Sequence, residues 1–144
     1  MKFYIATDHA GVRYKDAVKD MLVSRGIEVE DLGPFNTDRV DYPDYAQKCA
    51  EAVKADKGSL GILICGTGIG MSIAANKVDG IRAALCHDAY TAAMARAHNE
   101  AQILCFGERV LGLGTVESII DSFINTNPEG GRHAQRVEKI MKIK

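Results

Sequence analysis

A short apolar run that ends in a cysteine and three spaced glycines constrains the fold of this chain more than any other segment. The run reads Leu60-Gly61-Ile62-Leu63-Ile64-Cys65-Gly66-Thr67-Gly68-Ile69-Gly70-Met71-Ser72. Its apolar part predicts a buried strand, its glycines predict a tight turn, and the residues from Ser72 onward predict a helix. A strand, a turn and a helix in this order form the repeating unit of α/β folds.

Strands and helices are expected to alternate along the whole chain. The expected strands are Phe3–Ala6, Ile27–Leu32, Leu60–Ile64, Ile81–Cys86 and Ala101–Phe106. The expected helices are Tyr14–Ser24, Tyr45–Ala55, one from Ser72, Ala89–Ala97, Thr115–Phe123 and a last one that opens at Glu129-Gly130-Gly131. Ile27–Leu32 alternates as an edge strand does, and Gly33–Pro43 reads as a polar loop. This order predicts a three-layer, Rossmann-like α/β fold: a five-stranded parallel sheet with helices on both faces plus a C-terminal helix. Residues 1–144 are expected to form a single domain.

The composition of the chain argues against two classes of binding partner, nucleic acids and membranes. The formal net charge of -1 argues against a general nucleic-acid binder. No apolar stretch approaches the ~20 residues that span a bilayer, and the apolar run after Met1 is too short for a signal peptide. We therefore expect a cytoplasmic protein without a membrane partner. In that compartment the four cysteines are expected to be free thiols: Cys49, Cys65, Cys86 and Cys105. All of them except Cys65 are expected to be packing residues.

The position of Cys65 favours reactivity. A thiol between the end of a strand and the start of a helix lies near backbone N–H groups that carry partial positive charge, which favours thiolate. The same N–H groups can hold an oxyanion or a phosphate, and glycines let the backbone approach it. The alternative is a buried cysteine before an ordinary turn.

Arg132 and Arg136 form a second candidate site near the end of the chain. They are four residues apart on an expected helix and therefore share one face. Paired guanidinium groups suit a phosphate, although a solvated basic face is the alternative.

The expected topology of the sheet places the remaining candidate site residues at its two ends. Ligands of open parallel sheets bind beyond the carboxyl ends of the strands. The polar residues expected there are Asp8, His9, Cys65–Ser72, His87, Asp88 and Gly107-Glu108-Arg109. His98 and Asn99 instead close a helix, so they should lie at the opposite end of the sheet. If His98 is functional, a second subunit has to supply it.

Other site types fit less well. Gly66, Gly68 and Gly70 are one residue short of a dinucleotide fingerprint, and no histidines recur at metal-ligand spacing. We expect no metal and no cofactor. A Cys–His hydrolase is conceivable, but a glycine turn around a thiol suits an enolate as well as a tetrahedral oxyanion.

Several motifs together resemble the type B ribose-5-phosphate isomerases, which group with the galactose-6-phosphate isomerase subunits. The motifs are Asp8-His9-Ala10-Gly11, Asp41-Tyr42-Pro43, Cys65-Gly66-Thr67-Gly68-Ile69-Gly70, Ile73-Ala74-Ala75-Asn76-Lys77, Gly80-Ile81-Arg82-Ala83, His98-Asn99 and Gly130-Gly131-Arg132-His133. The resemblance runs essentially end to end. It implies interconversion of D-ribose 5-phosphate and D-ribulose 5-phosphate without a metal, in a homodimer or a dimer of dimers with active sites shared between subunits.

The resemblance also implies roles for single residues. Cys65 matches the base that moves a proton through a cis-enediolate, and His98 matches the group that opens the furanose ring. Thr67 is a candidate proton relay. Residues that match or adjoin substrate contacts are Asp8, His9, Tyr42, Gly66, Gly68, Ile69, Gly70, Ser72, Asn99, Arg109, Arg132, His133 and Arg136. Some relatives replace the cysteine by a glutamate on the following helix, but Met71–Lys77 contains no acid.

Two alternatives stay open at this point. One is an isomerase of a six-carbon phosphosugar, such as allose 6-phosphate or galactose 6-phosphate. The other is a non-catalytic sensor that binds sugar phosphates or nucleotides with the same glycine turn and does not need Cys65.

Overall fold

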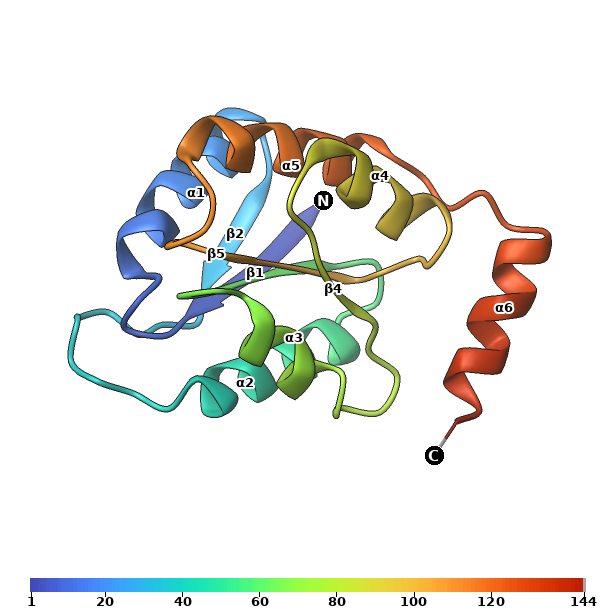
Figure 1. Cartoon of the computed structure of the whole chain (residues 1–144), viewed down its shortest axis with the longest axis horizontal. Coiled ribbons are helices and arrows are strands. Elements are labelled where there is room, and N and C mark those ends of the chain that lie inside the picture. Colours follow the sequence, from blue (N-terminus) through green and yellow to red (C-terminus); the bar gives the residue numbers. More distant parts are fainter. Residues whose placement is uncertain (144) are drawn as a thin grey trace.

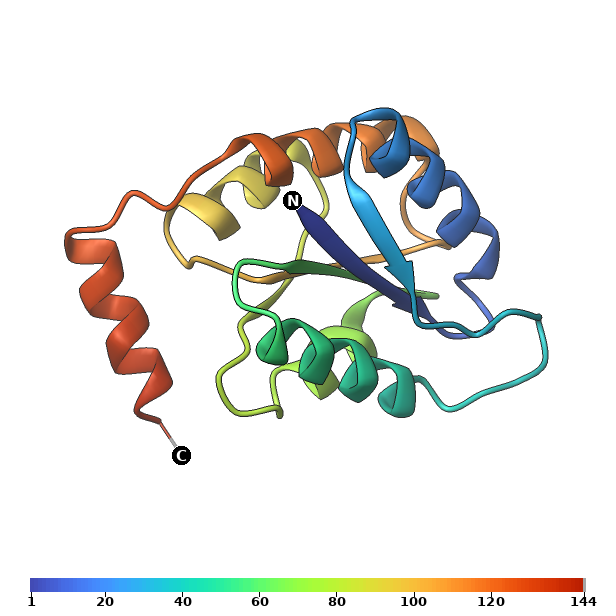
Figure 2. The ribbon, with the colours of Figure 1, turned by 180° about the vertical axis from the view of Figure 1, so that it is seen from behind.

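Five parallel strands form one sheet in the order β2-β1-β3-β5-β4 (Figures 1 and 2). A computed structural model describes residues 1–143 of the chain. The strands are β1 (Lys2–Thr7), β2 (Glu28–Asp31), β3 (Leu60–Cys65), β4 (Ala83–Leu85) and β5 (Ile103–Gly107). The helices are α1 (Val12–Ser24), α2 (Tyr42–Ala55), α3 (Ile69–Ala75), α4 (Ala89–Ala97), α5 (Leu113–Asn125) and α6 (Arg132–Met141). The predicted α/β fold and the edge position of β2 are confirmed.

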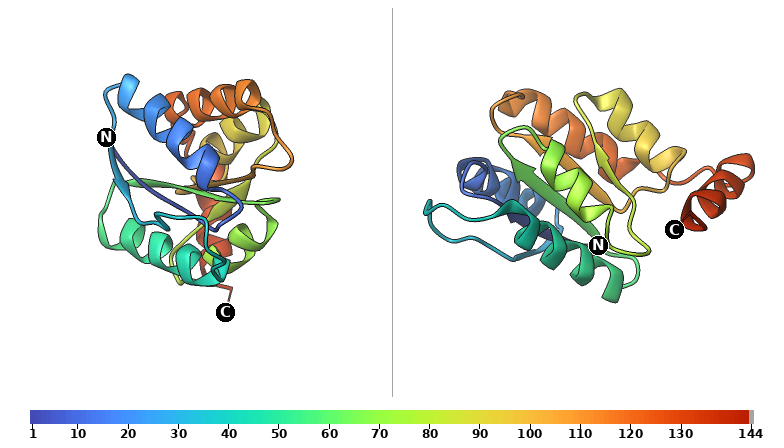
Figure 3. Two further views of the ribbon diagram at one scale, coloured as in Figure 1. Left: turned by 90° about the vertical axis from the view of Figure 1, so that its left-hand side faces the viewer. Right: turned by 60° about the horizontal axis from the view of Figure 1, so that its bottom comes forward.

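Helices cover both faces of the sheet (Figure 3), and the sheet separates two apolar cores. Successive strand residues point to opposite faces, so Phe3 and Ile5 of β1 join one core while Tyr4 and Ala6 join the other. Residues of α1, α4 and α5 complete the first core, and residues of α2 and α3 complete the second. Because both faces are covered, β3 is buried along its whole length.

The chain changes direction in the sheet between β1 and β3. β2 lies on one side of β1 and β3 on the other, with all pairs parallel. Loops leave the carboxyl ends of β1 and β3 toward opposite faces, and ligands of open α/β sheets bind at such a switch point. Asp8 follows β1, and Cys65 ends β3.

The helix α6 lies outside the two helix layers (Figure 1). The segment before it turns at Gly130 and Gly131, whose φ angles of 73° and 57° are ones that glycine adopts readily. Only His133 and Val137 of α6 are buried. Most of the surface of this helix is therefore open to solvent or to another chain.

Four helices begin earlier than the sequence predicts: α1 at Val12, α2 at Tyr42, α3 at Ile69 and α5 at Leu113. The third helix starts at Ile69 instead of Ser72, because the turn is completed by Gly68 in the left-handed region and the Ile69 N–H donates to the Thr67 hydroxyl at 3.2 Å. The second helix starts at Tyr42, inside the segment expected to be a loop, since Pro43 is favoured in a first helical turn. Among the described residues, no helix combines the length and apolarity that crossing a membrane requires.

Candidate active site

Cys65 occupies the end of β3 and is 6% exposed. The backbone N–H of Gly68 donates a hydrogen bond to its Sγ at 3.0 Å. A donor held by the turn stabilises negative charge on the sulfur without having to reorganise. The expected position of the thiol, between a strand end and a helix start, is confirmed.

The three other cysteines are placed for packing. Burial raises the pKa of Cys49 to about 12 and that of Cys86 to about 11, and it raises the pKa of Cys105 as well. All three are buried in the described structure, as expected. Their thiols therefore stay protonated and unreactive at neutral pH.

A Cβ at either of two turn glycines would make a close contact. Gly68 has a φ of 81°, and a Cβ there would lie 2.7 Å from the carbonyl carbon of Phe106. A Cβ on Gly70 would lie 2.5 Å from the ring of Tyr42. The turn is therefore pressed against β5 on one side and against the start of α2 on the other.

Asp8 and His9 come to the same edge of the sheet. Thr7 pairs with Ile64, so the next residue on each strand, Asp8 and Cys65, leaves the sheet at the same level. The Asp8 carboxylate is buried and accepts a hydrogen bond from the Ala10 N–H at 2.9 Å. The Nδ1 atom of His9 accepts from the Val40 N–H at 3.2 Å, which leaves the other ring nitrogen to carry the proton.

Arg109 arrives from the neighbouring strand. Its backbone N–H donates to the Gly66 carbonyl at 3.0 Å, and its guanidinium lies over Gly66, 3.4 Å from where a Cβ would be. We call this group of residues the thiol cluster; its members are Asp8, His9, Cys65–Gly70 and Arg109. Of the other expected contacts on this side, Tyr42 packs on Gly70, and the Ser72 hydroxyl donates to the Ile69 carbonyl.

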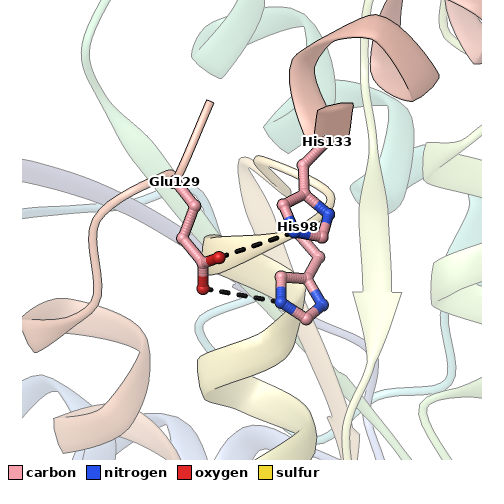
Figure 4. A group of neighbouring side chains, drawn as sticks. All are labelled: His98, Glu129 and His133. Carbon is pink, nitrogen blue, oxygen red and sulfur yellow. Dashed lines mark ion pairs between the residues drawn. The ribbon is translucent and has the colours of Figure 1, made fainter. Parts of the chain in front are cut away.

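A second group of polar residues lies at the opposite end of the sheet, where α4 ends and α6 begins (Figure 4). The His98 and His133 rings are stacked, with centroids 4.0 Å apart and planes at 5°. The two Glu129 carboxylate oxygens lie 3.5 Å from the Nε2 atoms of these two rings. We call His98, Glu129 and His133 the imidazole cluster.

The imidazole cluster carries less positive charge than its two rings would suggest. Burial, the nearby His98 ring, Arg132 and Arg136 lower the pKa of His133, while Glu129 acts in the opposite direction. His133 is therefore neutral at neutral pH. Glu129 is not among the site residues predicted from the sequence. The sequence offers one signal for it, an acidic residue directly before the two glycines that precede α6.

The stacked rings do not have the geometry of a metal site. One possible ligand atom from each of His98, Glu129 and His133 lies within 4.8 Å of the other two, a spacing at which three side chains can share a metal ion. An imidazole lone pair lies in the ring plane, so two parallel stacked rings direct their lone pairs along parallel lines and not to one point. The arrangement suits one shared carboxylate acceptor better than a cation.

The structure divides the expected site residues into two sets. The thiol cluster gathers Asp8, His9, Cys65 and Arg109, with Thr67 and the glycines of the turn. His98 and Asn99 lie beyond the end of α4 instead, and the turn after α5 brings Arg132, His133 and Arg136 there. The expectation that His98 lies at the opposite end of the sheet from Cys65 is confirmed.

Comparison with known proteins identifies the family. The sequence profile described as Ribose/Galactose Isomerase matches residues 3–140. The chain belongs to this family. Ribose-5-phosphate isomerase B of Escherichia coli is 47% identical to it over 99% of this chain and 95% of its own length.

Solved structures of the family have the same fold. The ribose-5-phosphate isomerase B of Clostridium thermocellum is 51% identical, with a TM-score of 0.96 over 99% of this chain and 96% of the other. The Mycoplasma genitalium ribose-5-phosphate isomerase B, solved with bound ribulose-5-phosphate, is 43% identical, with a TM-score of 0.93 over 98% and 94% of the two chains. The resemblance noted in the sequence is thereby confirmed.

Proposed function

We propose that this chain is an aldose–ketose isomerase that interconverts D-ribose 5-phosphate and D-ribulose 5-phosphate. The observation that carries the proposal is a thiol at the carboxyl end of β3, 3.0 Å from a backbone donor, in a chain of the Ribose/Galactose Isomerase family. A relative of 43% identity was solved with the product sugar bound.

Cys65 is the proposed base. Its thiolate removes the proton from C2 of the open sugar, and the electron pair of the C–H bond moves to the carbonyl to give a cis-enediolate. The proton then returns to C1, while Thr67 relays a proton between O1 and O2. N–H groups of the glycine turn stabilise the negative oxygen, and such fixed donors often give the largest electrostatic contribution to catalysis.

His98 is the proposed group for ring opening. The C1–O4 bond of the furanose breaks, its electron pair remains on O4, and O4 takes a proton from the imidazolium. The proton of the C1 hydroxyl passes to the Asp8 carboxylate as the aldehyde forms. Arg132 and Arg136, assisted by His9, Asn99, Arg109 and His133, hold the phosphate and the hydroxyls, which orients a flexible open chain.

We propose that the active site is shared between the two subunits of a homodimer. Two such dimers can associate to form a tetramer. Within one chain Cys65 and His98 lie at opposite ends of the sheet, so one sugar needs His98 of the partner subunit. Two further features support this assembly. On α3, Ile69 of the thiol cluster and Ile73 one turn further on are 51% and 62% exposed, and α6 lies outside the helix layers (Figure 1).

A turnover assay with ribose 5-phosphate and allose 6-phosphate side by side tests the proposal. Higher kcat/KM for ribose 5-phosphate supports it. A preference for the six-carbon sugar would assign the chain to the six-carbon branch of the family. Binding of either sugar phosphate without turnover would identify a sensor.

A further inference from the structure

The imidazole cluster contains a carboxylate to which the proposed reaction gives no role. Glu129 follows Pro128 in the turn between α5 and α6, and its backbone N–H donates to the Ala97 carbonyl at 2.9 Å. That bond fixes the backbone of Glu129 against the end of α4, one residue before His98. The side chain is exposed, yet both of its oxygens face imidazole nitrogens (Figure 4).

A carboxylate can only accept hydrogen bonds, so its place beside Nε2 favours a proton on that atom. The Nδ1 atom of His98 lies on the side of the ring away from Glu129 (Figure 4). A proton that His98 gives to a substrate oxygen then comes from Nδ1, while the Nε2 proton stays with the carboxylate. We propose that Glu129 is a positioning residue, which fixes the His98 tautomer and offsets the charge of its imidazolium; this rests on the proposed function.

The stacked ring of His133 explains why a protonated His98 needs a negatively charged partner such as Glu129. Two imidazolium rings stacked at 4.0 Å would repel each other strongly, and Arg132 and Arg136 add further positive charge nearby. One carboxylate offsets one positive charge. The side chain of His98 is 38% exposed and that of His133 is 10% exposed, so His98 is the more accessible ring to a substrate.

Nitrogen NMR measures the tautomer directly. The chain has four histidines, so long-range ¹H–¹⁵N spectra of the full-length protein can be assigned by single substitutions. At a pH where His98 is neutral, we expect its proton on Nε2 in the wild type and a mixture of both tautomers in Glu129→Gln. A proton on Nδ1 in the wild type, or an unchanged Nε2 tautomer in Glu129→Gln, would overturn the proposal.

Kinetics separate positioning from a structural effect. Glu129→Gln keeps the backbone bond to Ala97 and removes only the charge, so we expect kcat on ribose 5-phosphate to fall on the order of tenfold. The 4-deoxy analogue of ribose 5-phosphate lacks the hydroxyl that closes the furanose and needs no ring opening. On this analogue we expect less than about a twofold loss, because base catalysis by Cys65 is unaffected.

The matched control is Glu138→Gln, which changes an exposed acid on α6 and should leave both activities unchanged. Equal losses on the two substrates in Glu129→Gln would indicate a displaced α6 and contradict the proposal, as would no loss on either. A wild type that turns over neither sugar phosphate would refute the proposed function instead, and the NMR result would then still decide the tautomer.

Discussion

A single thiol among four has the surroundings of a reactive group. Cys65 has a turn N–H at 3.0 Å from its sulfur, while burial raises the pKa of Cys49, Cys86 and Cys105. Reactivity toward alkylating agents follows the thiolate, so the four residues should differ. The difference lies in the backbone around each sulfur and is not visible in the residue type.

Replacement of this thiol should separate chemistry from binding. Cys65→Ala is expected to reduce isomerisation at least about a hundredfold, because the proton shuttle is lost while the turn and the phosphate contacts remain. Iodoacetamide should label Cys65 faster than the other three cysteines, and ribose 5-phosphate should slow that labelling, as peptide mass spectrometry can show. Retained activity in Cys65→Ala would refute the role of this residue.

At the scale of elements, the turn between β3 and α3 depends on glycine. Gly68→Ala is expected to destabilise the fold by about 2 kcal/mol, because alanine is strained at a φ of 81° and its Cβ would meet the Phe106 backbone. Gly114→Ala in α5 is the control. Its Cβ meets open space, so it should stabilise by about 0.5 kcal/mol. Urea unfolding measures both changes, and a neutral Gly68→Ala would contradict the strained turn.

A buried ion pair joins α1 to β2. Lys15 is 2% exposed in its side chain and lies 3.1 Å from Asp31, which also pairs with Lys19 at 2.9 Å. Burial alone would raise the pKa of Asp31, but hydrogen bonds from Lys19, the Gly33 N–H and Lys15 outweigh it and lower the pKa. The contacts therefore favour the charged carboxylate.

This lowered pKa predicts a pH-dependent loss in Asp31→Asn. The contribution of Asp31 is fully present above the unfolded-state pKa of about 3.9 and is lost as the pH falls through the lower folded-state value. At pH 7 we expect Asp31→Asn to be less stable by about 2 kcal/mol, and we expect the wild type and the variant to converge once the pH falls below the folded-state pKa of Asp31. Urea unfolding at several pH values tests this. Asp121→Asn is the control, because it removes the charge of a more exposed ion pair with Arg25. It should lower the free energy of unfolding by less than about 1 kcal/mol. A pH-independent difference for Asp31→Asn would exclude the carboxylate as its cause.

At the scale of the whole molecule, the two clusters of site residues predict complementation between subunits. A dimer of one Cys65→Ala and one His98→Asn subunit would hold one doubly damaged site and one intact site. Random pairing in an equal mixture makes half the dimers mixed, so roughly a quarter of wild-type activity should return. Mass-tagged subunits would establish that exchange occurs. If proven exchange restores no activity, Cys65 and His98 do not meet across an interface.

The alternating elements, the parallel sheet and the place of Cys65 at the end of a strand can all be predicted from the amino-acid sequence. These follow from local signals: apolar periodicity, spaced glycines and the residues that end helices. The predicted starts of α2 and α3 are each three residues too late, because Tyr42 and Ile69 become helical through a favoured Pro43 and a left-handed Gly68. His98, Glu129 and His133 come together only in the folded chain, since His98 is 31 positions from Glu129 and 35 from His133 and the turn before α6 brings them into contact. No local pattern encodes such a contact, because it depends on where two separate elements end in space.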